Sequence, residues 1–127
     1  MARPSLGNQE LDVLQYVTDH QPVAVREVAT VFAERRGLAR TTILTVMERL
    51  RKKGYLVRSK AEGIFRYSAS LPKAELLRNL IRDFTERVLG GSLQPFVAYM
   101  AEDAEVTDQE LTDLQRLVRT LKSKRKS

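Results

Sequence analysis

The sequence predicts a mainly helical protein with one small β-hairpin, and three observations support this fold class. Apolar residues recur at helical spacing in three short segments of the first half. Two alternating segments follow on either side of Gly63, which is the pattern of a hairpin. From Pro72 onward the helical spacing returns. A chain of 127 residues is long enough for one compact domain and an extension.

Three short helices are expected first, at residues 8–20, 25–36 and 40–53. Asn8 is the candidate N-cap of the first helix, and Pro22 follows its end because proline does not continue a helix. Gly37 can adopt the left-handed conformation that ends the second helix, and Gly54 closes the third.

A hairpin is expected next, with strands at residues 55–60 and 64–68. The connecting three-residue loop ends in Gly63, which tolerates a positive φ. Because side chains alternate along a strand, Phe65 and Tyr67 should point inward and Arg66 outward.

Three further helices are expected after Pro72. The first is amphipathic and runs to a glycine pair at 90–91, and the second carries Pro95 in its first turn, where proline is tolerated. The third opens with a capping box formed by Thr107 and Glu110. We therefore predict a first domain at residues 1–71, a helical unit at 72–122 and a disordered basic tail at 123–127.

Charge and composition narrow the function classes. The net charge is +6, and residues 1–71 hold 12 Lys/Arg against 7 Asp/Glu, which suggests a polyanion partner. A solvated surface with charges of both signs is the alternative. There is no cysteine, the only histidine is His20, and no glycine-rich phosphate loop is present, so we expect neither an enzyme nor a metal or cofactor site. No apolar run could span a membrane, and residues 1–5 lead into no signal segment, so a cytoplasmic protein without membrane insertion is expected.

The segment 40–53 separates into two faces on a helical wheel. The buried stripe consists of Ile43, Val46, Met47 and Leu50. The opposite face carries Thr41, Thr45, Glu48 and Lys52. Short hydroxyls and free N–H groups near a helix N-terminus permit close approach to phosphates and base edges. The alternative for the cations at the other end is a favourable interaction with the helix dipole.

Three short helices, the last of them cationic, followed by a basic hairpin define a winged helix-turn-helix. The wing would place Arg58, Lys60 and Arg66 against a DNA backbone. The alternative is that these are charges of exposed strands that discourage aggregation. A winged helix can also be a protein-interaction adaptor without operator specificity. Binding that survives moderate salt without a DNA sequence preference would indicate that class.

Five stretches carry a resemblance to a known family: LGNQELDVLQYV, VREVATVFAERRGLARTTILTVMERLRKKGYL, GIFRYSA, VLGGSLQPFVAYM and VTDQELTDLQRLV. The most specific part is the pattern TT-x-x-T-x-x-x-RL-x-KKG from Thr41 to Gly54. Over nearly its whole length the chain thus resembles the penicillinase-repressor (BlaI/MecI) family of bacterial transcriptional regulators. The resemblance implies an N-terminal winged helix, a C-terminal helical dimerisation arm, and a homodimer that represses transcription from a palindromic double-stranded DNA operator.

Matching residue by residue, the resemblance implies DNA contacts in two groups. The reading face corresponds to Arg40, Thr41, Thr42 and Thr45, and basic positions near the backbone correspond to Lys52, Lys53 and Arg66. The helical wheel adds Arg49, and the hairpin adds Arg58 and Lys60.

The arm has apolar faces on short helices and little mass within one chain to cover them. The residues expected to pack across a two-fold axis are Phe84, Val88, Leu111, Leu114, Val118 and Leu121. The resemblance also implies that a regulatory protease cuts the arm near residues 96–101, around Tyr99 and Met100. The alternative is that this segment is only core.

Three departures from the family pattern matter. The paired-cysteine tail of the related copper-responsive repressors is absent, so copper sensing is not expected. Leu44 stands where some relatives carry an arginine on the reading face, and an apolar residue there could contact a thymine methyl group. Ala24 stands where a threonine N-cap is common, which should weaken the start of the second helix.

Overall fold

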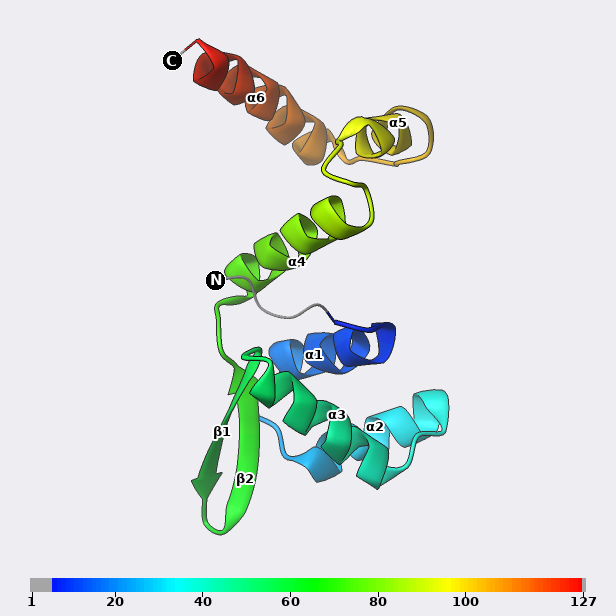
Figure 1. Ribbon diagram of the computed structural model, residues 1–127, viewed down its shortest axis with the longest axis vertical. Coiled ribbons are helices and arrows are strands. Elements are labelled where there is room, and N and C mark those ends of the chain that lie inside the picture. Colours follow the sequence, from blue (N-terminus) through cyan, green and yellow to red (C-terminus); the bar gives the residue numbers. More distant parts are fainter. Residues whose placement is uncertain (1–5, 127) are drawn as a thin grey trace. The chain divides into compact units, whose positions relative to one another are not determined.

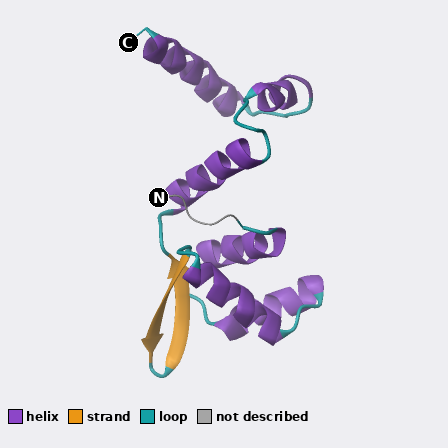
Figure 2. Cartoon of the chain, viewed as in Figure 1, coloured by secondary structure: helices purple, strands orange, loops and turns teal. Residues whose placement is uncertain are grey.

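The computed structural model describes residues 6–126 and confirms the mainly helical class with one hairpin (Figure 1, Figure 2). Its elements are α1 (Asn8–His20), α2 (Val25–Arg36), α3 (Arg40–Lys52), β1 (Leu56–Ala61), β2 (Ile64–Ala69), α4 (Lys73–Arg87), α5 (Gln94–Glu102) and α6 (Asp108–Arg125). The expectation of no signal segment at residues 1–5 and the last residue of the predicted tail, Ser127, lie outside the described residues. None of the described helices is long and apolar enough to cross a membrane.

The core of the first unit lies where α1, α2 and α3 meet the base of the hairpin. All four residues of the predicted stripe on α3 are buried, with Ile43, Met47 and Leu50 completely enclosed. They pack with apolar residues of α1, α2, the hairpin and the start of α4: Val13, Leu14, Val17, Val28, Phe32, Tyr55, Leu56, Tyr67 and Leu76. Burying this stripe fixes which face of α3 is left for solvent.

The helix ends mostly follow local signals. Gly37 ends α2 in the left-handed conformation with φ 65°, as predicted. The predicted N-cap at Asn8 is wrong, because Gly7 occupies the cap position and Asn8 is the first helical residue. Gly7 has no side chain to cap the first turn, and the Glu10 carboxylate instead accepts the backbone N–H of Gly7 at 3.1 Å.

The hairpin is antiparallel, and Ala61 pairs with Ile64. The connection is therefore a two-residue turn, shorter than the predicted three-residue loop. Glu62 and Gly63 both have positive φ, at 54° and 78°, as a type I′ hairpin turn requires. At its base the hairpin is tied to the segment before α2, because Val23 and Tyr67 exchange two backbone hydrogen bonds of 3.0 and 2.7 Å.

The inward orientation predicted for Phe65 is wrong, whereas that of Tyr67 is right. Tyr67 is 1% exposed, but Phe65 is 43% exposed. The two side chains share a strand face, yet Phe65 lies nearer the turn, where the hairpin extends past the helices (Figure 1). The Arg58 guanidinium covers its ring instead, 4.2 Å from the ring centroid.

A division of the chain into two compact units falls inside α4, between Asp83 and Phe84. Leu76 of α4 belongs to the core of the first unit, so the helix starts there rather than as part of a separate arm. The predicted boundary at residue 72 stays a prediction, since contacts do not test independent folding.

The second unit contains α5 and α6. Thr107 and Glu110 form the predicted capping box at the start of α6, with hydrogen bonds of 2.9 and 3.1 Å. Pro95 lies in the first turn of α5, also as predicted. The structure differs from expectation at the tail, because α6 continues to Arg125 and residues 123–125 are helical. Cations in the last turn of a helix interact favourably with its dipole, which supports this extension.

Candidate nucleic-acid interface

The solvent face of α3 presents the predicted hydroxyls. Thr41 and Thr45 are exposed, whereas Thr42 is half-buried. The Thr45 hydroxyl donates a hydrogen bond to the backbone carbonyl of Thr41 at 3.0 Å. Since a hydroxyl has one proton to donate, this bond leaves the Thr45 oxygen as an acceptor toward solvent.

The predicted cations do not share one environment. Arg40, Arg49 and Lys52 are exposed on α3. Lys53, directly after the helix, is 28% exposed and forms an ion pair of 2.8 Å with Glu10 of α1. Three of these cations are thus exposed to solvent, and the fourth, Lys53, is paired with a carboxylate of the same chain.

The wing cations are also engaged by carboxylates or rings. Arg58 approaches Glu48 at 3.2 Å, and Arg66 lies 3.8 Å from Glu27 of α2. The ammonium of Lys60 lies 5.4 Å from the centroid of the Phe65 ring. The hairpin therefore carries its predicted positive charges, but two of the three are partly neutralised by α2 and α3.

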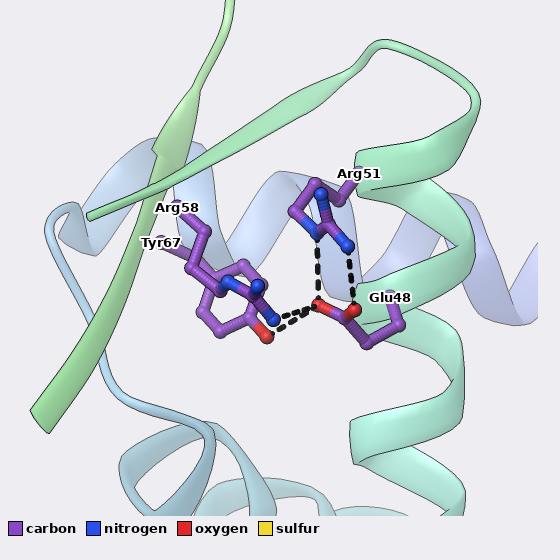
Figure 3. A network of polar contacts seen from close by, with 4 residues as sticks. All are labelled: Glu48, Arg51, Arg58 and Tyr67. Atoms are coloured by element: carbon purple, nitrogen blue, oxygen red, sulfur yellow. Dashed lines mark hydrogen bonds and ion pairs between the residues drawn. The ribbon is translucent and has the colours of Figure 1, made fainter. Parts of the chain in front are cut away.

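The Glu48 carboxylate joins α3 to both strands of the hairpin (Figure 3). Arg51, on the same helix, donates two hydrogen bonds of 3.1 and 2.9 Å to its two oxygens. The Tyr67 hydroxyl of β2 donates a bond of 2.6 Å, and Arg58 of β1 donates one of 3.2 Å. We call these four residues the Glu48 network.

The Glu48 network shifts the protonation of its members. The hydrogen bonds from Arg51 and then Tyr67 lower the pKa of Glu48 to about 2, against an ordinary value of 4.5. Burial, and then the hydrogen bond to Glu48, raise the pKa of Tyr67. Glu48 is consequently a carboxylate and Tyr67 a neutral donor at physiological pH.

A groove of about 710 Å³ lies between α3, the start of α2 and the hairpin. Its walls are mostly apolar side chains and arginines, with a threonine, a glutamate and a tyrosine among them: Ala24, Val25, Arg26, Arg40, Thr41, Leu44, Glu48, Arg58, Gly63, Ile64, Phe65 and Tyr67. Two of the predicted reading residues and one wing residue thus border a single concave surface, and three members of the Glu48 network, Glu48, Arg58 and Tyr67, form part of its walls.

The sequence reasoning missed Glu48 as a structural link, and it missed Arg26 and Glu27. Glu48 was placed on the solvent face with the hydroxyls, where nothing local shows that it meets Tyr67, 19 residues further on. The one signal was a carboxylate in a face otherwise made of hydroxyls and cations. Such a residue repels phosphate unless it serves another partner.

The predicted arm residues are solvent-accessible in the single chain. Phe84, Val88, Leu111, Val118 and Leu121 are exposed, and Leu114 is half-buried. Tyr99 of α5 is exposed and Met100 is half-buried. Among residues 6–126, no cluster of three or more metal-ligating side chains is present.

Three helices, a hairpin at their edge, and a hydroxyl-rich, cationic solvent face on the third helix define a winged helix-turn-helix protein of the DNA-binding class. The chain belongs to the penicillinase repressor family, whose family model matches residues 6–120. This confirms the family inferred from the sequence. Membership in a family of transcriptional repressors points to a non-enzymatic role.

Curated relatives are distant but nearly full-length. The chain is 24% identical to the penicillinase repressor of Staphylococcus aureus, over 91% of each chain. It is 24% identical to the penicillinase repressor of Bacillus licheniformis, over 97% of this chain and 96% of that one. It is 28% identical to the transcriptional regulator BlaI of Mycobacterium tuberculosis, over 87% and 85% of the two chains.

Solved structures support the same fold. The solution structure of the DNA-binding domain of the repressor BlaI matches with a TM-score of 0.52 and 26% identity, over 59% of this chain and 93% of that one. The monomeric form of Bacillus licheniformis BlaI in complex with the blaP half-operator matches with a TM-score of 0.50 and 26% identity, over 57% and 88%. The winged-helix fold is therefore established for the first part of the chain.

Proposed function

We propose that the protein is a sequence-specific transcriptional repressor that acts in the cytoplasm and reads an operator with α3. One observation carries this proposal: α3 turns two exposed threonines and three exposed cations to solvent while its opposite face is completely buried. The similar BlaI domain bound to a half-operator supports it. A helix with this division of faces suits the major groove, where base edges are read.

In this proposal Thr41 and Thr45 contact base edges. Because the Thr45 proton is engaged by the Thr41 carbonyl, its oxygen would accept a hydrogen bond from an amino group of cytosine or adenine. Leu44, exposed on the same surface, suits a thymine methyl group. Arg40 and Thr42 would orient the start of the helix near the phosphates.

The remaining basic residues would hold the DNA backbone. Arg49 and Lys52 are exposed on α3 and suit phosphate contacts. Lys60 is exposed near the turn of the hairpin and suits the same role in the wing. Arg58, Arg66 and Lys53 would reach phosphate only in competition with Glu48, Glu27 and Glu10.

We further propose that two copies bind a palindromic operator as a homodimer. The apolar residues of the arm are accessible to solvent in one chain, so contact with a second chain would bury them: Phe84, Val88, Leu111, Leu114, Val118 and Leu121. A two-fold pair would space two α3 helices about one DNA turn apart, or a multiple of it. Two linked half-sites bind far more tightly than either alone.

Repression would end when the arm is cut near Tyr99 and Met100. The family resemblance is the basis of this proposal, and the exposure of Tyr99 supports it. Both residues lie within α5, so a protease would need this nine-residue helix to open locally. Cutting there would remove the gain from linking two half-sites without altering α3.

The test separates residues that contact base edges from residues that contact only the DNA backbone. The operator is first selected from a pool of random duplexes, and binding is then measured to operator and random DNA over a range of salt. Thr41→Ala and Thr45→Ala should lose discrimination, with each base contact worth on the order of 1–3 kcal/mol. Lys52→Ala should weaken both duplexes alike and reduce the salt slope by about 0.9.

Thr30→Ala is the matched control. Thr30 is an exposed threonine on α2, and its hydroxyl bonds the carbonyl four residues earlier at 3.0 Å, as Thr45 does. Removing it should leave discrimination unchanged. Unchanged discrimination in both α3 threonine variants would refute the assignment of α3. A wild-type chain that selects no sequence would indicate the adaptor class instead.

A further inference from the structure

The outer half of the hairpin has few attachments to the helices. At the base, Tyr55 and Leu56 are buried and Val23 pairs with Tyr67. Beyond that pair, residues 57–65 are exposed along both strands and the turn. The attachments there are the hydrogen bond of Arg58 to Glu48, the 3.8 Å contact of Arg66 with Glu27, and the hydrogen bond of the Tyr67 hydroxyl to Glu48.

We propose that Glu48 is a positioning residue that raises sequence discrimination by holding the hairpin against α3 and by keeping Arg58 from DNA phosphates. This inference rests on the proposed function, because discrimination requires a reading helix. It adds a role for a carboxylate that would otherwise only oppose binding to DNA.

The geometry supports the holding role. Arg51 donates to both oxygens of Glu48, a two-point contact that fixes the plane of the carboxylate. The fixed carboxylate then receives one donor from each strand, Arg58 from β1 and Tyr67 from β2 (Figure 3). One side chain of α3 thereby sets the distance and angle of the outer hairpin.

The charges support the second part of the proposal, that Glu48 keeps Arg58 from DNA phosphates. Non-specific DNA affinity comes almost entirely from cations that neutralise phosphates. Glu48 neutralises Arg58 and Arg51 within the chain, and its own charge repels the backbone. Losing the carboxylate would therefore free two guanidinium groups for any duplex while loosening the wing. Affinity for random DNA would rise and discrimination would fall.

Three variants separate positioning from simple charge. Glu48→Gln removes the charge and the strong acceptor. Tyr67→Phe keeps every charge and the buried ring, and removes the hydroxyl with its bond to Glu48 and its interaction with Arg58. Glu27→Gln is the matched control, because it removes one carboxylate near the wing while glutamine can still accept the N–H of Ala24 that Glu27 holds at 3.2 Å.

Dissociation constants for operator and random duplex are measured as a function of salt for the wild type and each variant. Glu48→Gln should bind random DNA about fivefold more tightly, lower the operator-to-random ratio about tenfold, and steepen the salt slope by about 0.9 to 2. Tyr67→Phe should lower the ratio about threefold at an unchanged slope. Glu27→Gln should strengthen both duplexes equally and leave the ratio unchanged.

Hydrogen exchange of the hairpin amides gives a second measurement that needs no DNA. Exchange should accelerate at residues 57–65 in Glu48→Gln and in Tyr67→Phe, and change much less in Glu27→Gln, which loses only the 3.8 Å contact with Arg66. The inference is overturned if Glu48→Gln keeps the wild-type ratio of operator to random affinity, or if its affinities change only as much as those of Glu27→Gln. It is also overturned if hydrogen exchange of the hairpin amides is unaffected in Glu48→Gln. A wild type that shows no sequence preference would instead refute the proposed function, and hydrogen exchange would still decide whether Glu48 holds the hairpin.

Discussion

Replacing Glu48 by glutamine should also destabilise the first unit by an amount that depends on pH. Its pKa lies at about 2 in the folded chain, against an ordinary 4.5, because Arg51 and Tyr67 donate hydrogen bonds to the charged form. A carboxyl group with a lowered pKa stabilises the fold above its unfolded pKa. That stabilisation is lost as the pH falls from about 4.5 through about 2.

The contacts of Glu48 determine how large this destabilisation should be. One pKa unit corresponds to about 1.4 kcal/mol, so the whole shift would be worth about 3 kcal/mol. Because the Glu48 side chain is 24% exposed and Arg51 lies near the surface, solvent screens part of this. Glutamine also keeps one acceptor oxygen. We expect Glu48→Gln to lower the free energy of unfolding by about 1–2 kcal/mol at pH 7.

Denaturant unfolding, followed by circular dichroism at fixed protein concentration between pH 7 and pH 2.5, measures this difference. The gap between wild type and Glu48→Gln should be constant above pH 4.5 and shrink steadily below it. Glu27→Gln, which loses only a 3.8 Å surface contact, should differ from wild type by less than about 0.5 kcal/mol. A gap of the same size at pH 7 and pH 2.5 would refute the charged network as its cause.

Two further predictions concern the arm. Joint replacement of Leu114→Asp and Val118→Asp should give monomers in sedimentation and poor operator affinity, because charges would be buried at the two-fold contact; a monomeric wild type with tight operator binding would contradict this. In the native host, inducing conditions should yield fragments cut near Tyr99 and Met100, mapped by mass spectrometry. Derepression with an intact chain would exclude cleavage.

Signals confined to a few residues predicted the fold well. Gly37, Pro95 and the pair of Thr107 and Glu110 were each assigned correctly from the chemistry of a helix end. The buried stripe of α3 was also predicted, since helical spacing alone determines it. Asn8 failed as a cap because the helix begins one residue earlier than expected, with Gly7 at the cap position and its N–H donated to the Glu10 side chain.

Properties that depend on distant contacts were not predictable. Alternation placed Phe65 and Tyr67 on one face, but how far the helices reach along that face is a tertiary property. Likewise the wheel placed Glu48 toward solvent, and only the folded hairpin brings Tyr67 and Arg58 to it. The candidate DNA-contacting residues stay predictions, although the structure now separates exposed ones from those already engaged.

This separation changes how the positive charge of the chain should be interpreted. Composition alone counts every lysine and arginine of the basic first half as a possible phosphate contact. In the structure, Lys53 and Arg58 face carboxylates, whereas Arg40 and Lys52 are exposed on α3, the helix of the reading threonines. Cations that contact only phosphates would strengthen binding to any DNA, since phosphates are alike in every sequence. Pairing Lys53 and Arg58 internally reduces this contribution and leaves Arg40, Arg49 and Lys52 exposed on the helix that carries Thr41 and Thr45. A repressor that must find one operator gains from that arrangement, because its specificity depends on the ratio of two affinities rather than on either alone.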